Sequence, residues 1–166
     1  MTHTNISVLP IVFRPRTGYA GNMKIASPSN HLIKVFIADD SLIVREHLVT
    51  LLDELAGIKI VGQAEHVSEA ISMIRNLQPD VVILDIRMPG GSGIDVLRNI
   101  KQHGVGPMVI ILTNYPYPGY RQKCLQAGAD FFLDKSTEFD QIPALFGQLK
   151  PDKNPPVEDL SESRIE

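Results

Sequence analysis

The chain has 166 residues, of which 43% are hydrophobic and 21% are charged, and its formal net charge at pH 7 is −3. This composition is ordinary for one globular domain with some additional sequence, and it excludes a whole-protein basic field for nucleic acid. The single cysteine, Cys124, excludes an intrachain disulfide and favours a reducing, cytoplasmic compartment, and no apolar run approaches the length of a membrane span.

The two ends of the chain differ from the middle. Residues 1–32 contain three basic residues and no acidic one, whereas residues 151–166 contain five acidic residues, two basic residues and three prolines. The last segment has no apolar period, which is typical of a solvated tail. We therefore predict a disordered extension over residues 1–32, one domain over residues 33–150 and an acidic disordered tail over residues 151–166.

Short apolar segments alternate with amphipathic stretches through the middle of the chain. The apolar segments predict strands at residues 33–38, 58–64, 81–84, 108–112 and 131–133. Apolar residues at spacings of three and four predict helices near residues 44–55, 67–77, 94–100, 122–127 and 137–149. Five apolar strands separated by helices favour an α/β fold, a doubly wound parallel sheet with helices on both faces.

Several residues indicate where the helices begin and end. Ser41 is suited to cap the first helix, and Pro79 stops the second. Thr137 and Asp140 have the spacing of a capping box for the last helix, and Pro143 is tolerable only if that helix begins shortly before it.

Polar residues follow the ends of the predicted strands. Asp39 and Asp40 come after the first strand, Asp85 after the third, Thr113 after the fourth and Lys135 after the fifth. In a doubly wound sheet these ends share one edge, where ligands bind. A single carboxylate in such a place could be a helix cap or a turn residue, but agreement among four strand ends indicates a site.

The grouping of these side chains indicates phosphoryl chemistry. Three close carboxylates favour either proton uptake or a bound cation, and oxygen ligands of this kind suit Mg2+. A carboxylate beside such a metal can act as a nucleophile in phosphoryl transfer. The glycines at positions 90, 91 and 93 lack the Gly-Lys-Ser/Thr ending of a nucleotide-binding loop, so they are expected to shape the turn after Asp85.

These motif positions resemble the receiver domain of bacterial two-component response regulators, over residues 33–150. The resemblance implies a flavodoxin-like (βα)5 fold with strand order 2-1-3-4-5. It also implies that Asp85 is the phosphoacceptor. Asp40, Asp85 and the backbone carbonyl of Arg87 would bind Mg2+, Asp40 directly, whereas Asp39 would bind it mainly through water.

The same resemblance assigns three further residues. Thr113 matches the switch hydroxyl of the family, Lys135 its phosphoryl-binding lysine and Phe132 its aromatic switch position, where tyrosine is common. Ser136 follows Lys135 at a position where many receivers have proline. This sequence looks more like that of receivers attached to helix-turn-helix regulators. Tyr115 and the nearby tyrosines at positions 117 and 120 form an unusual loop, which we interpret as packing partly onto the fourth helix.

The resemblance implies a stand-alone, single-domain response regulator, not an enzyme beyond slow self-dephosphorylation. The expected phosphodonor is a histidine kinase or a histidine phosphotransfer protein. The signal is expected to reach a downstream protein through the face of the fourth helix, fifth strand and fifth helix, or to continue in a phosphorelay. The sixteen residues after Lys150 are too few for a DNA-binding domain, so no direct binding to nucleic acid or membrane is expected, and homodimerisation is left open.

Three alternatives remain beside this interpretation. The chain could be a receiver-derived regulator that lost its DNA-binding output domain, or a scaffold that binds partners without phosphorylation. An aspartate-nucleophile phosphatase of the haloacid-dehalogenase type is disfavoured, because Arg87 occupies the position where those enzymes require a second aspartate.

Overall fold

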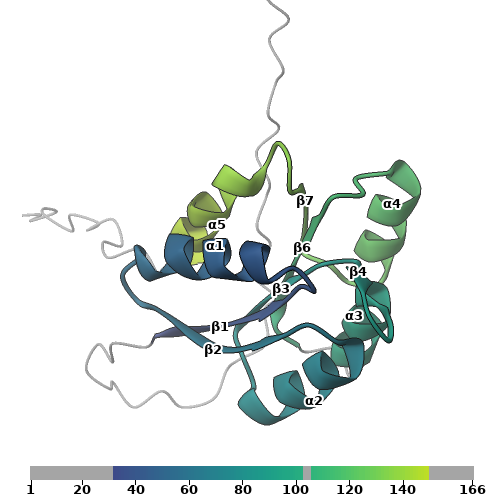
Figure 1. The fold of residues 1–166 in the computed structure, drawn as a ribbon, viewed down its shortest axis with the longest axis horizontal. Helices are drawn as coiled ribbons and strands as arrows, with labels where there is room; N and C mark the ends of the chain where they lie inside the picture. The colour runs from purple at the N-terminus through teal and green to yellow at the C-terminus, as the bar shows by residue number, and fades with distance from the viewer. Residues whose placement is uncertain (1–31, 103–105, 150–166) are drawn as a thin grey trace, which may run out of the picture.

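The computed structural model describes residues 32–102 and 106–149. The predicted acidic tail and, except for residue 32, the predicted N-terminal extension lie outside the described residues. The elements, in chain order (Figure 1), are β1 (Ile33–Ala38), α1 (Leu42–Asp53), β2 (Ile58–Ala64), α2 (Val67–Leu77), β3 (Val81–Leu84), β4 (Arg87–Met88), β5 (Gly91–Ser92), α3 (Gly93–Lys101), β6 (Met108–Thr113), α4 (Pro118–Gln126), β7 (Phe131–Asp134), the 3-10 helix η1 (Phe139–Gln141) and α5 (Ile142–Leu149). No helix within these two ranges has the length and apolar character needed to cross a bilayer.

Five strands form one parallel sheet in the order β2-β1-β3-β6-β7. The strands lie in the predicted order 2-1-3-4-5, so the expectation of a doubly wound, flavodoxin-like sheet is confirmed. The order reverses between β1 and β3, and at such a point the loops after neighbouring strands leave a crevice at the carboxyl edge of the sheet.

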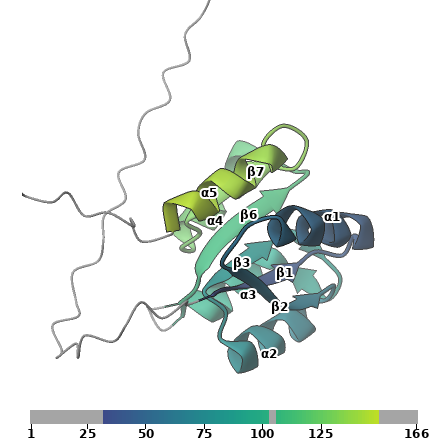
Figure 2. The same cartoon turned by 90° about the vertical axis from the view of Figure 1, so that its left-hand side faces the viewer.

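The sheet separates two apolar cores, because successive side chains of a strand point to opposite faces. In β1, Val35 and Ile37 pack with buried residues of α1 and α5, whereas Phe36 and Ala38 pack with buried residues of α2, α3 and α4. Figure 2 shows α1 and α5 on one side of the sheet and α2 on the other. All of these strand side chains are essentially inaccessible to solvent, so both faces of the sheet are covered.

The ends of two helices differ from the prediction. The fourth helix begins at Pro118, before the predicted residue 122, because proline is well suited to the first turn. The fifth was predicted from Thr137, but α5 begins at Ile142, after η1, so Thr137 and Asp140 do not form a capping box for it. Pro143 therefore lies in the first turn of α5, where proline is tolerated.

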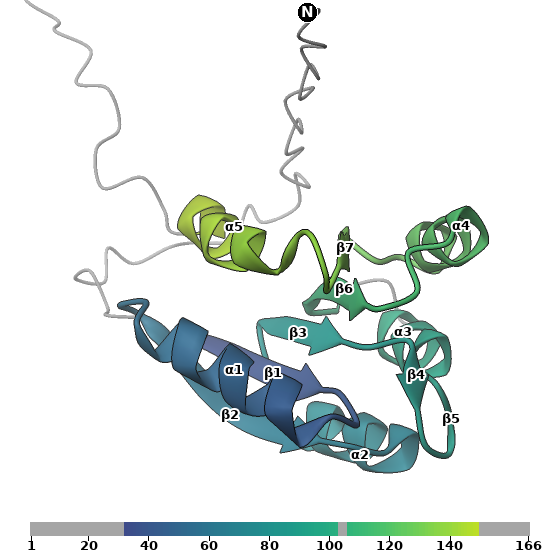
Figure 3. The same cartoon turned by 45° about the horizontal axis from the view of Figure 1, so that its top comes forward.

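Two other features concern the site more directly. Ser41 caps α1 as predicted, since its Oγ accepts a hydrogen bond of 3.4 Å from the backbone N–H of Val44. The short antiparallel ribbon of β4 and β5 was not predicted. Figure 3 shows this ribbon following the end of β3, so it forms one wall of the carboxyl edge.

Candidate functional site at the carboxyl edge of the sheet

The predicted site residues meet at the carboxyl edge, because each lies at or directly after the end of a parallel strand. The oxygens of Asp39, Asp40 and Asp85 that could ligate a metal all lie within 4.8 Å of one another. Asp39 and Asp85 are buried, whereas Asp40 is exposed. The cluster therefore has two buried carboxylates and one at its mouth.

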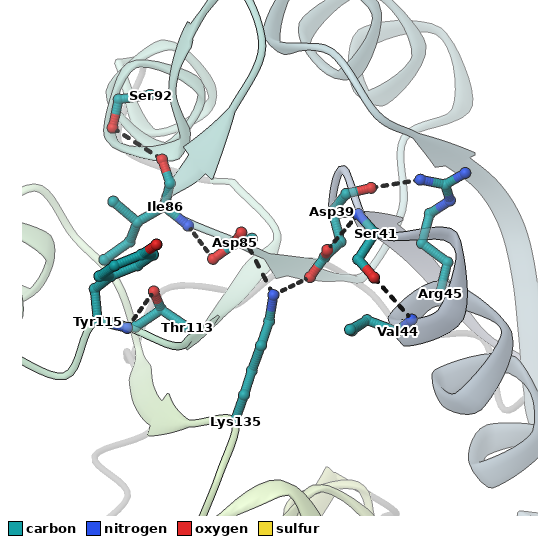
Figure 4. A network of polar contacts seen from close by, with 10 residues as sticks. All are labelled: Asp39, Ser41, Val44, Arg45, Asp85, Ile86, Ser92, Thr113, Tyr115 and Lys135. Carbon is teal, nitrogen blue, oxygen red and sulfur yellow. Dashed lines mark hydrogen bonds and ion pairs between the residues drawn. The ribbon is translucent and has the colours of Figure 1, made fainter.

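Lys135 connects the two buried carboxylates (Figure 4). Its Nζ lies 2.6 Å from Oδ2 of Asp39 and 3.4 Å from Oδ2 of Asp85, and its side chain is only 7% exposed. One ammonium group thus contacts two of the three clustered carboxylates, and the site keeps an excess of negative charge. Such an excess favours a bound cation.

The charge state of Asp85 follows from these neighbours. Burial raises the pKa of its carboxyl above the ordinary value, the positive charge of Lys135 opposes this rise, and the negative charge of Asp39 adds to it. The backbone N–H of Ile86 donates a 2.8 Å hydrogen bond to Asp85 Oδ1 and so fixes the carboxyl group in the pocket. A cation that neutralises the cluster would favour the ionised, nucleophilic form.

Arg45, which was not among the predicted residues, supports the acidic loop. Its Nη1 donates a 2.6 Å hydrogen bond to the backbone carbonyl of Asp39, and its Nη2 lies 3.7 Å from a carboxylate oxygen of Glu65 after β2. The N–H of Ser41 donates to Asp39 Oδ1 at 2.9 Å. Arg45 lies one turn into α1, and long helix side chains point back towards the N-terminus; that spacing could have indicated its role.

The glycine turn shapes the loop after Asp85, as predicted. The N–H of Gly93 donates a 2.8 Å hydrogen bond to the carbonyl of Ile86. A Cβ atom at position 93 would lie 1.9 Å from the carbonyl oxygen of Asp85, so only glycine fits there. Gly90 has a φ of 84°, which favours glycine in the turn between β4 and β5.

The two predicted switch residues are both buried. Thr113 is fully buried, and its Oγ1 accepts a 3.1 Å hydrogen bond from the N–H of Tyr115 (Figure 4). Phe132 is 3% exposed and lies among the core residues between the sheet and α4. The guanidinium of Arg121 on α4 lies 5.3 Å from the centre of this ring and donates a hydrogen bond to the Phe132 carbonyl. The aromatic ring is therefore already directed inward.

Arg87 and a row of tyrosines border the mouth of the site. The Arg87 guanidinium lies 4.3 Å from the centre of the Tyr115 ring, which is a cation–π geometry. The Tyr115 and Tyr117 rings are 6.4 Å apart, as are the Tyr117 and Tyr120 rings. Tyr115 and Tyr120 are half-buried, while Tyr117 is 61% exposed. An open cleft of about 430 Å³ adjoins this row, lined in part by Asp40, Arg87 and Tyr120.

The fold and this acidic pocket define a signal receiver, and sequence comparison identifies the family. The sequence-family model of the response regulator receiver domain matches residues 35–146. The chain therefore belongs to that family and to two-component regulatory systems. It is 39% identical over 111 residues to the uncharacterized transcriptional regulatory protein YvfU of Bacillus subtilis, covering 67% of this chain and 56% of that protein. It is 32% identical to the transcriptional regulatory protein DesR of the same organism, covering 67% of this chain and 55% of that protein.

Solved structures give the same result. The signal receiver domain of NarL from Mycobacterium tuberculosis superposes with a TM-score of 0.66 at 28% identity, covering 72% of this chain and 96% of that one. A CheX–CheY complex with BeF3 and Mg2+ from Borrelia burgdorferi gives a TM-score of 0.60 at 28% identity, covering 69% and 89%. The predicted family is confirmed, and the chain spans little more than half the length of the two relatives from Bacillus subtilis.

Proposed function

We propose that the chain acts as a cytoplasmic response regulator whose receiver domain accepts a phosphoryl group on Asp85. The observation that carries the proposal is the position of Lys135, whose ammonium group contacts both Asp39 and Asp85. This arrangement sets a fixed positive charge beside the proposed nucleophile and leaves the rest of the acidic cluster for a metal ion. A buried acidic cluster without phosphoryl chemistry, as in a scaffold, would gain nothing from the repulsion among its carboxylates.

The proposed donor is a phosphohistidine of a histidine kinase or a histidine phosphotransfer protein. A carboxylate oxygen of Asp85 attacks phosphorus in line, the bond from phosphorus to the histidine nitrogen breaks, and the electron pair leaves with the imidazole. The product is an aspartyl phosphate, and Lys135 would pair with one of its phosphoryl oxygens, since its Nζ lies 3.4 Å from Asp85 Oδ2.

The acidic cluster fits Mg2+. Three carboxylates with ligand oxygens within 4.8 Å and one compensating lysine suit a hard divalent cation. Asp39, Asp40, Asp85 and the backbone carbonyl of Arg87 would hold it, and when bound it would neutralise charge on the phosphoryl oxygens. The Borrelia burgdorferi complex with BeF3 and Mg2+ supports this assignment by similarity.

Thr113 is proposed to transmit the signal. Its Oγ1 accepts a hydrogen bond from the Tyr115 N–H, so binding of the hydroxyl to a phosphoryl oxygen would rearrange the loop that leads into α4. Phe132 is already inward, held beside Arg121, so the proposed change moves α4 and this loop more than the ring. Tyr117 and Leu125, at the start of α4 and within it, have exposed apolar side chains. Such side chains favour a protein target over nucleic acid.

That target is either an effector protein or the next member of a phosphorelay. The experiment that tests the proposal is phosphorylation by acetyl phosphate, followed by intact-protein mass spectrometry. Wild type with Mg2+ should gain one phosphoryl group, whereas Asp85→Asn and wild type with excess EDTA should gain none. Equal labelling of wild type and Asp85→Asn would refute the proposal.

A further inference from the structure

We propose that Asp134 and Ser136 are positioning residues for Lys135, and that together they form a side-chain clasp around the backbone of that lysine. The effect of the clasp on phosphoryl binding rests on the proposed function, whereas its effect on the contacts of Lys135 with Asp39 and Asp85 does not. Ser136 directly follows Lys135 and has both a backbone N–H and a hydroxyl to donate, so it can fix the loop after β7 through hydrogen bonds.

The clasp consists of two hydrogen bonds to one oxygen. Oδ1 of Asp134 accepts a hydrogen bond of 2.8 Å from the backbone N–H of Ser136 and one of 2.7 Å from its hydroxyl. An aspartate that accepts from the N–H two residues later forms a local turn that restricts the residue between them. That residue is Lys135. The hydrogen bonds from Ser136 also lower the pKa of Asp134, which keeps the acceptor ionised.

The backbone on either side of the lysine is fixed as well. The N–H of Asp134 donates to a carboxylate oxygen of Glu138 at 2.9 Å, and the carbonyl of Asp134 accepts from the N–H of Glu138 at 2.9 Å. The N–H of Lys135 donates to the carbonyl of Thr113 at 2.9 Å. With these bonds made, the side chain of Lys135 is directed towards Asp39 and Asp85.

Asp134 acts through the loop and not in the pocket. The metal-ligating cluster among the described residues comprises Asp39, Asp40 and Asp85 and does not include Asp134. Proline would fix this loop through its ring but would have no N–H to donate. Here the N–H of Ser136 is present and bonded, so hydrogen bonds take over the restriction that a ring would impose.

A double-mutant cycle on stability tests the clasp without any phosphoryl chemistry. Lys135→Met should cost less free energy of unfolding in an Asp134→Ala background than in wild type, because without the clasp the lysine holds its contacts with the carboxylates less firmly. Asp140→Ala removes an equal charge from the exposed helix η1 and should leave the cost of Lys135→Met unchanged. Equal costs in wild type and in the Asp134→Ala background would overturn the inference. If Asp134→Ala does not fold, Ser136→Ala, which removes only the hydroxyl bond, replaces it in the same cycle.

Binding of beryllium fluoride in the presence of Mg2+, followed by fluorine NMR, gives the second readout. Asp134→Ala should weaken binding about tenfold, the size expected for one hydrogen bond to a charged group, and should have no further effect when Lys135 is already methionine. An undiminished affinity in Asp134→Ala would overturn the inference. A wild type that binds no beryllium fluoride would count against the proposed function, and the stability cycle would still decide the clasp.

Discussion

Replacing Lys135 by methionine should destabilise the fold strongly, because it leaves two buried carboxylates without their cation. The side chains of Lys135, Asp39 and Asp85 are 7%, 2% and 5% exposed. Removing one partner of a buried ion pair typically costs about 3–5 kcal/mol. We expect a loss near the lower end, about 3 kcal/mol, because Asp85 can take up a proton in compensation.

Lys101 provides the matched control. Its Nζ lies 2.9 Å from Asp130 Oδ2, a distance similar to that of the Lys135–Asp39 pair, but the two side chains are 18% and 40% exposed. Solvent screens such a pair, so Lys101→Met should cost no more than about 1 kcal/mol. Both substitutions remove one positive charge and keep the aliphatic stem. The difference between their losses in free energy of unfolding therefore measures the effect of burying the ion pair at the site.

The loss in Lys135→Met should depend on pH. The positive charge of Lys135 is the main influence that lowers the pKa of Asp85, so the variant raises that pKa further above its unfolded value. The folded variant then binds a proton in a pH range where the unfolded chain does not. Its stability relative to wild type therefore rises as the pH falls towards the ordinary range of an aspartate. The deficit should be largest at neutral pH.

The assay is urea denaturation followed by far-ultraviolet circular dichroism at pH 7 and pH 5 without Mg2+, since the chain has no tryptophan for fluorescence. Adding Mg2+ should narrow the stability deficit of Lys135→Met, because the variant lacks the competing ammonium group and its carboxylates bind the cation more tightly than those of wild type. The reasoning is refuted if Lys135→Met loses no more stability than Lys101→Met at pH 7, or if its deficit grows on acidification.

Three further predictions concern the surroundings of the site. Gly93→Ala should destabilise the fold by about 1–3 kcal/mol in urea denaturation, because the added Cβ would clash with the backbone of Asp85. Gly119→Ala in α4 is the control: a Cβ there meets nothing within 4 Å, so it should be neutral or stabilising. Equal losses of stability in the two variants would contradict this prediction. Thr113→Ala should still accept a phosphoryl group, but phosphorylation should no longer change its binding to the partner. If phosphorylation changes partner binding in a pull-down as much for Thr113→Ala as for wild type, Thr113 is not part of the switch. Arg87→Ala combined with Tyr115→Ala should shorten the lifetime of the aspartyl phosphate, because removing this cation–π pair from the mouth of the site should open the path of attacking water. A tenfold change needs only about 1.4 kcal/mol, and a double variant that decays no faster than wild type would show that the pair does not roof the site.

The strands and the site residues could be predicted because each depends on a local pattern. Buried parallel strands are continuous apolar segments, and a parallel sheet brings the residues after those segments to one edge. Their positions after the predicted strands therefore indicate the clustered residues, which are Asp39, Asp40, Asp85, Thr113 and Lys135. The sequence pattern could not give their contacts. The burial of Asp39, the exposure of Asp40 and the preference of Lys135 for Asp39 depend on packing among loops from four strands.

The helices were less predictable where packing leaves no apolar stripe. In α4 the one buried residue is Cys124, so the sequence has too little periodicity to mark its beginning at Pro118. Burial raises the pKa of that thiol to about 11, so little of it is in the nucleophilic thiolate form at neutral pH. At α5, Glu138 bonds to the N–H of Asp134 and ties the segment to the loop, so the α-helix begins later, at Ile142. The start of α3, by contrast, is marked in the sequence by the capping-box spacing of Ser92 and Asp95.

The central claim is that the carboxylate of Asp85 becomes an acyl phosphate, and chemical trapping tests it most directly. Wild type is treated with acetyl phosphate and Mg2+, reduced with borohydride, digested and sequenced by tandem mass spectrometry. Borohydride reduces an acyl phosphate to an alcohol, so the account predicts homoserine at position 85, and aspartate at that position when acetyl phosphate is omitted. Homoserine at position 39 or 40 with aspartate retained at position 85 would contradict the account.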